Sequence, residues 1–414
     1  MHGPLHHFLE QNLPAYLDLL RQMVAINSFT RNVDGVNALG NLTAEAFAEL
    51  GFEAERVQST NPDFGRHLVL TRPGSSDSKI GLISHLDTVF PPEEEVRHDF
   101  HWRVEGDRIY GPGTVDIKGG TVMIYMILAG LQAHAPAIFD AINWTVLLNA
   151  SEETLSTDFG ELCLERLAGK TLGALVFEGG RWDEENNFAL VVARKGMAIY
   201  RVLVEGRAAH AGSSHDQGAN AIVQLSHVIQ RIAALTDYQQ QLTFNVGTVQ
   251  GGTVVNRVPH RAEALVEMRA FSPEVFEEGL QAMLSLAQQV DVTSPADEYP
   301  CRVTIQILRR TEPWAPNPRT ERLFRTWKVA GEALGAHLYR EERGGLSDGN
   351  LLWKSLPTID GMGPAGGNAH CSERSPDGSK DQEFVFPASF VPKAMLNIAG
   401  ITELVRRAEV VETE

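Results

Sequence analysis

Hydrophobic and polar positions follow two different periods along the first half of the chain. Apolar residues at helical spacing predict helices, and short apolar runs between turn residues predict strands. The expected helices are residues 5–24, 36–50, 118–134 and 161–167, and the expected strands are residues 55–57, 68–70, 80–83, 144–150 and 174–177. This alternation predicts an α/β catalytic domain with a mostly parallel mixed sheet that is flanked by helices.

The pattern changes after Arg194. The expected order is then β-α-β-β-α-β, which is typical of a ferredoxin-like α+β unit. Strands are expected at residues 197–204, 242–249, 262–270 and 303–308, and helices at residues 219–235 and 273–290. The α/β pattern resumes with residues 319–334, 347–354, 358–362 and a last helix at 388–406. We therefore expect a catalytic domain formed by residues 1–194 and 311–414, with an inserted ferredoxin-like domain at residues 195–310.

Composition narrows the possible functions. The 414 residues carry 36 Lys and Arg against 53 Asp and Glu, a formal net charge of −17 at pH 7. This negative net charge disfavours binding to nucleic acids and to anionic membrane surfaces, because basic residues must neutralise their phosphate groups. No apolar run is long enough for a membrane span, the N-terminus does not resemble a secretion signal, and there are only three cysteines. These features predict a cytoplasmic protein.

Residues that can bind metal ions stand at five places along the chain, three of them directly after predicted strands. They are His85 with Asp87 in SHLDTVFP, Asp116 in YGPGTVDIKGG, Glu152 and Glu153 in NASEETLS, Glu178 in FEGG, and His370 in GNAHC. In an open α/β sheet, ligands collect at the carboxyl ends of the strands. We therefore expect these side chains to form one site.

This set of residues suits a hydrolytic two-metal centre. Such a centre needs nitrogen and oxygen ligands and a carboxylate that bridges the ions, and mixed imidazole and carboxylate ligands favour zinc, with cobalt or manganese as substitutes. Either Glu152 or Glu153 is then left over and can act as a general base on the bound water. Asp87 is placed to orient the imidazole of His85. A nucleotide-binding enzyme is disfavoured, because the glycines at 111–120 lack the phosphate-loop spacing.

Together these motifs, with AAHAGSSHDQGANAI, resemble those of the di-zinc exopeptidases and deacylases. This family includes acetylornithine deacetylase, succinyl-diaminopimelate desuccinylase, aminoacylase and the bacterial glutamate carboxypeptidases, and the sequence is most similar to the glutamate carboxypeptidase branch. The resemblance covers essentially the whole chain. It implies that the chain binds two Zn²⁺ ions, with Glu152 as the general base, Asp87 as the support of one ligand, and five metal ligands: His85 and Glu178 on one ion, Glu153 and His370 on the other, and Asp116 bridging both.

The resemblance also implies roles for the inserted domain, which is the dimerisation domain in this family. His210 would stabilise the oxyanion in the partner subunit of a homodimer. Arg269 and Asn256 would hold the carboxylate of the substrate. Gly345 and Ser347 belong to a glycine-rich loop, starting at Gly344, that borders the substrate pocket.

The expected activity is hydrolysis of an amide bond next to a free amino-acid carboxylate, as in a carboxypeptidase that releases a C-terminal residue such as glutamate. An N-acyl amino-acid deacylase, a dipeptidase or a carbamoylase-like amidohydrolase is the alternative within enzymes, and a catalytically silent binding protein is the alternative outside them. Two positions depart from the family pattern. Ile117 and Ser151 stand where an aspartate is common, and neither position is a metal ligand.

Overall fold

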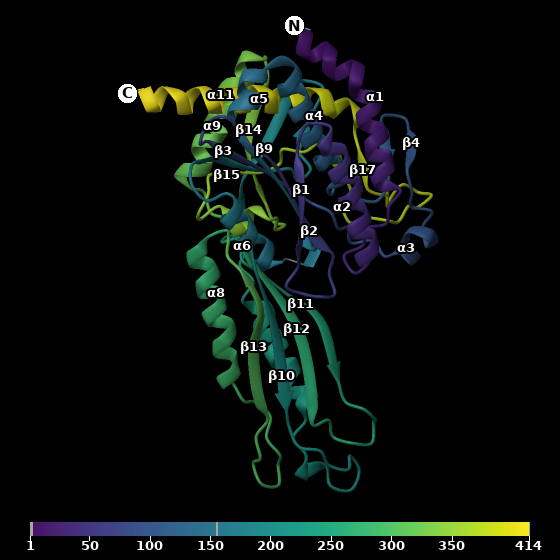
Figure 1. Ribbon diagram of the computed structural model, residues 1–414. Helices are drawn as coiled ribbons and strands as arrows, with labels where there is room; N and C mark the ends of the chain where they lie inside the picture. The colour runs from purple at the N-terminus through teal and green to yellow at the C-terminus, as the bar shows by residue number, and fades with distance from the viewer. Residues whose placement is uncertain (1–2, 155, 414) are drawn as a thin grey trace. The chain divides into compact units, whose positions relative to one another are not determined.

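The computed structural model describes residues 3–154 and 156–413 (Figure 1). The chain divides into two compact units. The first comprises residues 1–192, 316–341 and 347–414, and the second comprises residues 193–315 and 342–346. The fold class expected from the sequence, an α/β domain with an inserted α+β domain, is confirmed.

A six-stranded sheet forms the centre of the first unit. Its strand order is β1-β2-β6-β3-β7-β15. The pairs β6–β3, β3–β7 and β7–β15 are parallel, whereas β1–β2 and β2–β6 are antiparallel. The strands are β1 (Glu53–Gln58), β2 (Arg66–Arg72), β3 (Lys79–His85), β6 (Asn143–Asn149), β7 (Thr171–Val176) and β15 (Thr358–Ile359).

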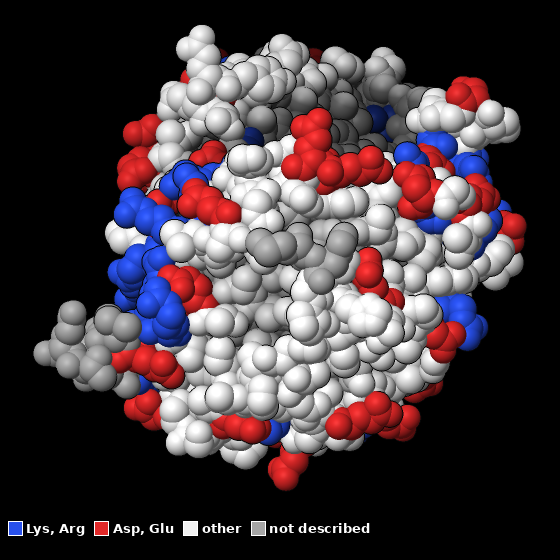
Figure 2. Space-filling model, turned by 90° about the horizontal axis from the view of Figure 1, so that it is seen from above, with Lys and Arg blue, Asp and Glu red and all other residues white. Residues whose placement is uncertain are grey.

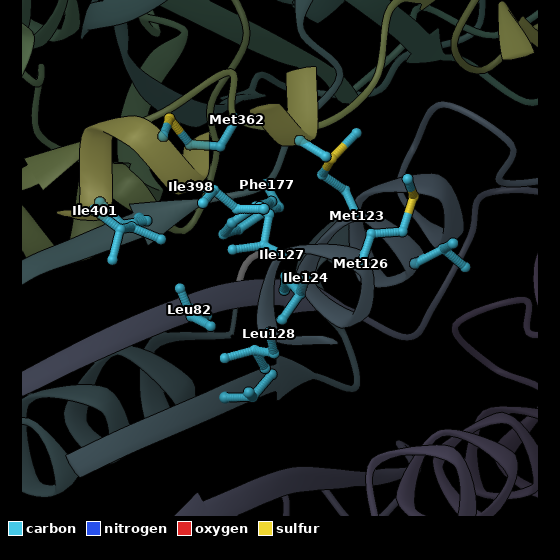
Figure 3. Packing of buried hydrophobic residues seen from close by; sticks show 14 of the residues in the cluster. Leu82, Met123, Ile124, Met126, Ile127, Leu128, Phe177, Met362, Ile398 and Ile401 are labelled. Atoms are coloured by element: carbon cyan, nitrogen blue, oxygen red, sulfur yellow. The ribbon is translucent and has the colours of Figure 1, made fainter. Parts of the chain in front are cut away.

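Alternate residues of the central strands enter two different hydrophobic cores, as the two-residue period of a strand requires. Leu82 of β3 belongs to the larger core, while its neighbour Ile83 belongs to the smaller one. Figure 3 shows side chains of helix α4, strand β3 and helix α11 gathered in the larger core. Burying one such Leu or Ile side chain contributes about 1.5–3 kcal/mol. The sheet is therefore covered on both faces, as a mostly parallel sheet must be.

The helices that build these cores mostly match the expected ranges. The larger core uses α1 (Pro4–Val24), α2 (Val33–Ala48), α4 (Lys118–His134), α5 (Pro136–Ala141), α9 (Pro318–Ala333) and α11 (Phe390–Thr413), and the smaller core uses α6 (Thr157–Arg166) and α10 (Gly349–Leu352). Helix α2 begins three residues earlier than expected, because the side chain of Asn32 caps it by accepting a hydrogen bond from the Gly35 amide at 3.2 Å. Helix α3 (Pro92–Arg97) was not expected, because none of its residues is buried.

Two smaller sheets are formed by strands outside the central sheet. Strand β9 (Asn187–Arg194) pairs with β8 (Arg181–Trp182) and with β14 (His337–Arg343). Strands β16 (Gly366–Gly367), β17 (Phe384–Val385), β5 (Arg108–Tyr110) and β4 (Arg103–Glu105) form the other. This second sheet matters for the site, because it joins the segment after His370 to the segment before Asp116.

The second unit is a four-stranded antiparallel sheet with two helices on one face. Its strand order is β11-β12-β10-β13. The elements are β10 (Gly196–Glu205), α7 (Ala221–Ala234), β11 (Thr243–Gly251), β12 (Arg261–Ala270), α8 (Pro273–Ser285) and β13 (Arg302–Thr311). This is the expected β-α-β-β-α-β order. Helix α8 ends at Ser285, earlier than expected, and the short 3₁₀ turn Leu286–Gln288 follows it.

Acidic side chains are dispersed over the face of the molecule that Figure 2 shows. On the face shown in Figure 2, acidic groups lie among basic ones, and a group of basic side chains gathers at one edge. Among the described residues, no helix is long and apolar enough to cross a membrane.

Candidate metal centre

Three neighbouring strands deliver the expected ligands to one edge of the central sheet. His85 is the last residue of β3, Glu152 and Glu153 follow β6, and Glu178 follows β7. Because these three strands are parallel neighbours, their carboxyl ends lie side by side. Asp116 comes from the loop before α4, and His370 from the segment between β16 and β17.

Asp116 lies between the two histidines and presents one carboxylate oxygen to each. Its Oδ1 is 3.1 Å from Nε2 of His85, and its Oδ2 is 3.2 Å from Nε2 of His370. The carboxylates of Glu178 and Glu153 each lie near one of the two histidines. Glu178 Oε1 is 3.9 Å from His85 Nε2, and Glu153 Oε2 is 3.2 Å from His370 Nε2. The arrangement therefore has two halves that share one aspartate.

These residues fit divalent cations. Oε1 of Glu153 is buried and has no hydrogen-bond partner among the described residues, which is costly unless a cation or a solvent molecule contacts it. Ligand atoms of His85, Asp116 and Glu153 all lie within 4.8 Å of one another. Nδ1 of His85 lies 2.9 Å from the backbone carbonyl of Asp87, so a proton on Nδ1 leaves the lone pair of Nε2 for a metal ion.

Asp87 contacts both the imidazole of His85 and the turn that carries Glu152 and Glu153. Its Oδ1 accepts a hydrogen bond from the Glu152 amide at 2.9 Å, and its Oδ2 accepts one from the Glu153 amide at 3.2 Å. The hydroxyl of Thr30 also donates to Oδ2, at 2.7 Å. The buried carboxylate of Asp87 therefore fixes the turn that carries the two glutamates, and its own carbonyl fixes the histidine ring.

Glu152 is 9% exposed. Burial raises the pKa of its carboxyl group well above the usual value, and the nearby charges of Asp348, Glu178 and Glu153 add to the increase, although His85 opposes it. A carboxyl group with a raised pKa is a stronger base once it is ionised, which is the property that a general base needs at neutral pH.

The candidate ligand groups influence one another's pKa values strongly. Burial and the charge of Asp116 raise the pKa of Glu153 to about 7. Hydrogen bonds to Asp116 and Glu153 raise the pKa of His370 to about 11. Burial would raise the pKa of Asp116, but the hydrogen bonds from His370 and His85 outweigh it and lower that pKa below its usual value. The raised pKa values of Glu153 and His370 therefore favour the protonated forms of these groups when no cation is bound.

Metal affinity is expected to rise with pH. Ligands must be deprotonated to bind, and the raised pKa values of Glu153 and His370 mean that binding near neutral pH releases protons. Each released proton makes the apparent association constant increase about tenfold per pH unit, so the affinity for Zn²⁺ should be at least about tenfold higher at pH 7.5 than at pH 6. Calorimetry in two buffers of different ionisation enthalpy measures the released protons. An affinity that does not change with pH would contradict this assignment of protons.

In the second unit, the structure places His210 next to Asn256. The His210 side chain is exposed, and its Nδ1 accepts hydrogen bonds from the amides of Gly212 and Ser213, both at 3.1 Å. A neutral imidazole that accepts at Nδ1 carries its proton on Nε2, so Nε2 can donate to an oxyanion. The backbone carbonyl of Asn256 accepts a hydrogen bond from the Ala211 amide at 3.0 Å.

Arg269 projects from β12 on the sheet face that α7 and α8 leave uncovered. Glu267 pairs with its guanidinium through two contacts, at 2.7 and 3.2 Å, and Nη1 donates to the Gly344 carbonyl at 2.9 Å. The next carbonyl of the glycine-rich loop, that of Gly345, accepts a hydrogen bond from Arg194 at 3.0 Å. Arg269 is thus held within its own unit by Glu267 and the Gly344 carbonyl, and its Nη2 also lies 3.6 Å from Sδ of Met197.

Ser347 belongs to the first unit and is fully buried. Its hydroxyl donates to Oδ2 of Asp360 at 2.8 Å and accepts from the Gly349 amide at 3.1 Å. The side chain therefore holds the start of α10.

Residues that the sequence did not single out support the turn of Glu152 and Glu153. His67 of β2 is 1% exposed; its Nδ1 accepts from the Ala150 amide at 3.1 Å, and its Nε2 lies 3.2 Å from Asp158. Asn149 donates to Asp348 at 2.8 Å. No local pattern signals the contacts of His67 with Ala150 and Asp158 or of Asn149 with Asp348, because they span 83, 91 and 199 residues.

The chain is similar to known proteins over most of its length. Residues 192–295 match the model of a peptidase dimerisation domain from the M20 family. The chain is 29% identical over 361 residues to carboxypeptidase G2 of Pseudomonas sp. (strain RS-16), covering 86% of this chain and 83% of that protein. It is 30% identical over 316 residues to acetylornithine deacetylase of Myxococcus xanthus, covering 71% and 77%. The chain belongs to the M20 peptidase family. It is therefore a hydrolase of the peptidase and deacylase class, and M20 enzymes are typically metal-dependent.

The M20 fold extends over nearly the whole chain. A tripeptidase from Staphylococcus aureus subsp. aureus Mu50 superposes with a TM-score of 0.75 at 19% identity, covering 95% of this chain and 99% of that one. At this identity the likeness concerns the fold alone.

Proposed function

We propose that this M20 protein is a two-metal amidohydrolase that cleaves an amide bond next to a free amino-acid carboxylate. The observation that carries the proposal is the placement of Asp116 between His85 and His370, with one carboxylate oxygen toward each imidazole. Glu178 would complete the ligands of one ion, and Glu153 those of the other. Zinc is the ion that this donor set favours, and cobalt or manganese are substitutes.

Bound metal ions would lower the pKa of a water molecule and polarise the amide carbonyl. The remaining work belongs to side chains of the chain. Glu152 takes the proton of the attacking water and returns it to the leaving amine. Asp87 keeps the Glu152–Glu153 turn and the His85 ring in place through the contacts described above. His210 of the partner subunit donates Nε2–H to the oxyanion of the tetrahedral intermediate. The match to a peptidase dimerisation domain supports a homodimer.

The favoured activity is that of a carboxypeptidase that releases a C-terminal residue such as glutamate, which the likeness to carboxypeptidase G2 supports. An N-acyl amino-acid deacylase is the second candidate, because the acetylornithine deacetylase of Myxococcus xanthus has a similar identity of 30%, although over a shorter part of this chain. Both substrates carry a free carboxylate, for which Arg269 and Asn256 are the proposed partners. The three cysteines are all free, which supports a cytoplasmic location.

The test combines metal analysis with a substrate panel. Purified protein is analysed for bound metal and assayed on glutamate-terminated peptides, other dipeptides and N-acetyl amino acids, with and without chelator. About two metal ions per chain and chelator-sensitive release of glutamate are expected. Faster turnover of N-acetyl amino acids would establish the deacylase instead. Metal binding without turnover of any class would favour a silent binding protein, and no metal after reconstitution with zinc or cobalt would overturn the proposal.

Arg269→Ala is expected to raise KM for a substrate with a free carboxylate by about tenfold to a hundredfold, because a hydrogen bond to a charged group contributes about 1.5–3 kcal/mol. The matched control is Arg201→Ala. Arg201 lies on the same unit, and its guanidinium also pairs with a glutamate, Glu263, at 2.7 Å. The control should leave KM unchanged. An equal effect of Arg269→Ala on a substrate whose carboxylate is amidated would refute carboxylate binding by Arg269.

A further inference from the structure

Glu383 is a fully buried carboxylate that the proposed mechanism does not use. It directly precedes strand β17, and its side chain reaches the loop of the bridging aspartate. Oε1 accepts hydrogen bonds from two consecutive backbone amides, those of Val115 at 2.9 Å and Asp116 at 3.0 Å. Its Oε2 has no hydrogen-bond partner among the described residues. The Glu383 side chain therefore contacts the backbone of the Asp116 loop through a single oxygen atom, Oε1.

The backbone of Glu383 contacts the other ligand loop. Its amide donates to the carbonyl of Cys371, the neighbour of His370, at 2.8 Å. The Cys371 amide in turn donates to the Asn368 carbonyl at 2.9 Å, which closes a turn around His370. His370 itself has a φ of 66°, in the left-handed region that is uncommon for residues with a side chain. The Glu383 amide thus contacts the residue that directly follows His370.

We propose that Glu383 is a positioning residue that holds the loops of Asp116 and His370 at the spacing in which both can bind the same metal ion. This inference rests on the proposed two-metal function. Within the described part of the chain, the regular element that joins the two loops is the short β5–β17 pairing, which begins at the residues next to Gly111 and Glu383. Glu383 binds the Asp116 loop through its side chain and the His370 loop through its backbone amide. It therefore sets the distance between the two loops directly.

A carboxylate is well suited to this task. Two adjacent amides, of the buried Val115 and the partly buried Asp116, need an acceptor, because a buried N–H group without a partner costs as much as a lost hydrogen bond. A single oxygen on a long side chain can satisfy both. The proposed role therefore depends on the reach of the side chain and on its acceptor atom, and these two properties can be varied separately.

The test compares three substitutions of Glu383. Glu383→Gln keeps the length and an acceptor oxygen, so this variant should bind Zn²⁺ within about threefold of the wild-type affinity. Glu383→Asp keeps the charge but loses one methylene of reach, and Glu383→Ala loses both. These two variants should bind Zn²⁺ about tenfold to a hundredfold more weakly, as is typical when a group that orients metal ligands is removed. Competition with a chromophoric chelator measures the affinity without any assay of activity.

Asn397→Ala is the control for a general loss of folding stability. Asn397 is also fully buried in the first unit, where it accepts from Trp327 at 3.1 Å and donates to the Met362 carbonyl at 2.9 Å. This variant should lower the melting temperature of the metal-free protein without changing Zn²⁺ affinity. Wild-type affinity in Glu383→Ala would overturn the proposal, and so would weak binding by Glu383→Gln together with normal binding by Glu383→Asp. Failure of the wild-type protein to bind Zn²⁺ would instead overturn the proposed function.

Discussion

Glu152→Gln is expected to keep the metal ions and to lose nearly all turnover. Glutamine has the same shape but cannot take a proton from water, and a general base contributes about a hundredfold to ten-thousandfold to the rate. Burial raises the pKa of Glu152, so its ionised form costs folding free energy, and the neutral glutamine should not lower the stability of the metal-free protein. The measurements are kcat on the best substrate of the panel, bound metal per chain and the melting temperature.

The neighbouring glutamate provides the control. Glu153→Gln should weaken metal binding, because Glu153 contacts His370 at 3.2 Å and is a proposed ligand. The two variants therefore separate chemistry from metal retention at adjacent positions. A Glu152→Gln variant that retains most of its kcat would show that another group acts as the base. Loss of metal from Glu152→Gln would mean that Glu152, and not Glu153, is the ligand.

The second large effect is expected for Asp116→Ala. The Asp116 carboxylate contacts both histidines, so its removal should weaken binding at both halves of the site. We expect Zn²⁺ affinity to fall by more than about a hundredfold, beyond the loss that is typical of groups outside the ligand set. Activity should fall below detection. Metal analysis after dialysis and the Zn²⁺-induced rise in melting temperature measure the effect.

Asp140→Ala is the control for loss of an ion-paired aspartate. Asp140 pairs with Arg72 at 2.6 Å on the surface of the same unit, where such pairs contribute about 0–1 kcal/mol. The Asp140→Ala variant should bind Zn²⁺ with the wild-type affinity. If Asp116→Ala still bound two ions per chain, the bridging role would be refuted, and if it bound one ion tightly, Asp116 would belong to a single ion only.

Local sequence patterns determined much of the first unit. The expected helix at residues 118–134 coincides with α4, because apolar residues occupy nearly every position of a helix that is buried on most sides. The expected strand at residues 144–150 is displaced by one residue from β6. Strand β14 was not expected, because its residues are mostly exposed and form no apolar run. Strand β9 was also not expected, although its apolar run is a usable signal for a buried strand.

Within the site, the sequence alone located the candidate ligands. His85, Glu152, Glu153 and Glu178 follow buried strands, and the carboxyl ends of neighbouring parallel strands meet at one edge for reasons of topology. The sequence could also propose that Asp87 supports His85. It could not show that the Asp87 carboxylate binds the amides of Glu152 and Glu153, because these contacts span 65 and 66 residues.

The order of residue types thus indicated the fold class of this M20 hydrolase through its periodicities, and its candidate metal ligands through the ligand preference of metal ions. Only the tertiary structure decided how the groups act on one another. The raised pKa of Glu152 depends on burial, which no neighbour in sequence sets. The role of Glu383 depends on amides that lie 268 and 267 residues earlier in the chain. Hydrogen bonds and electrostatic interactions depend on distance in space, and the folded chain alone sets that distance.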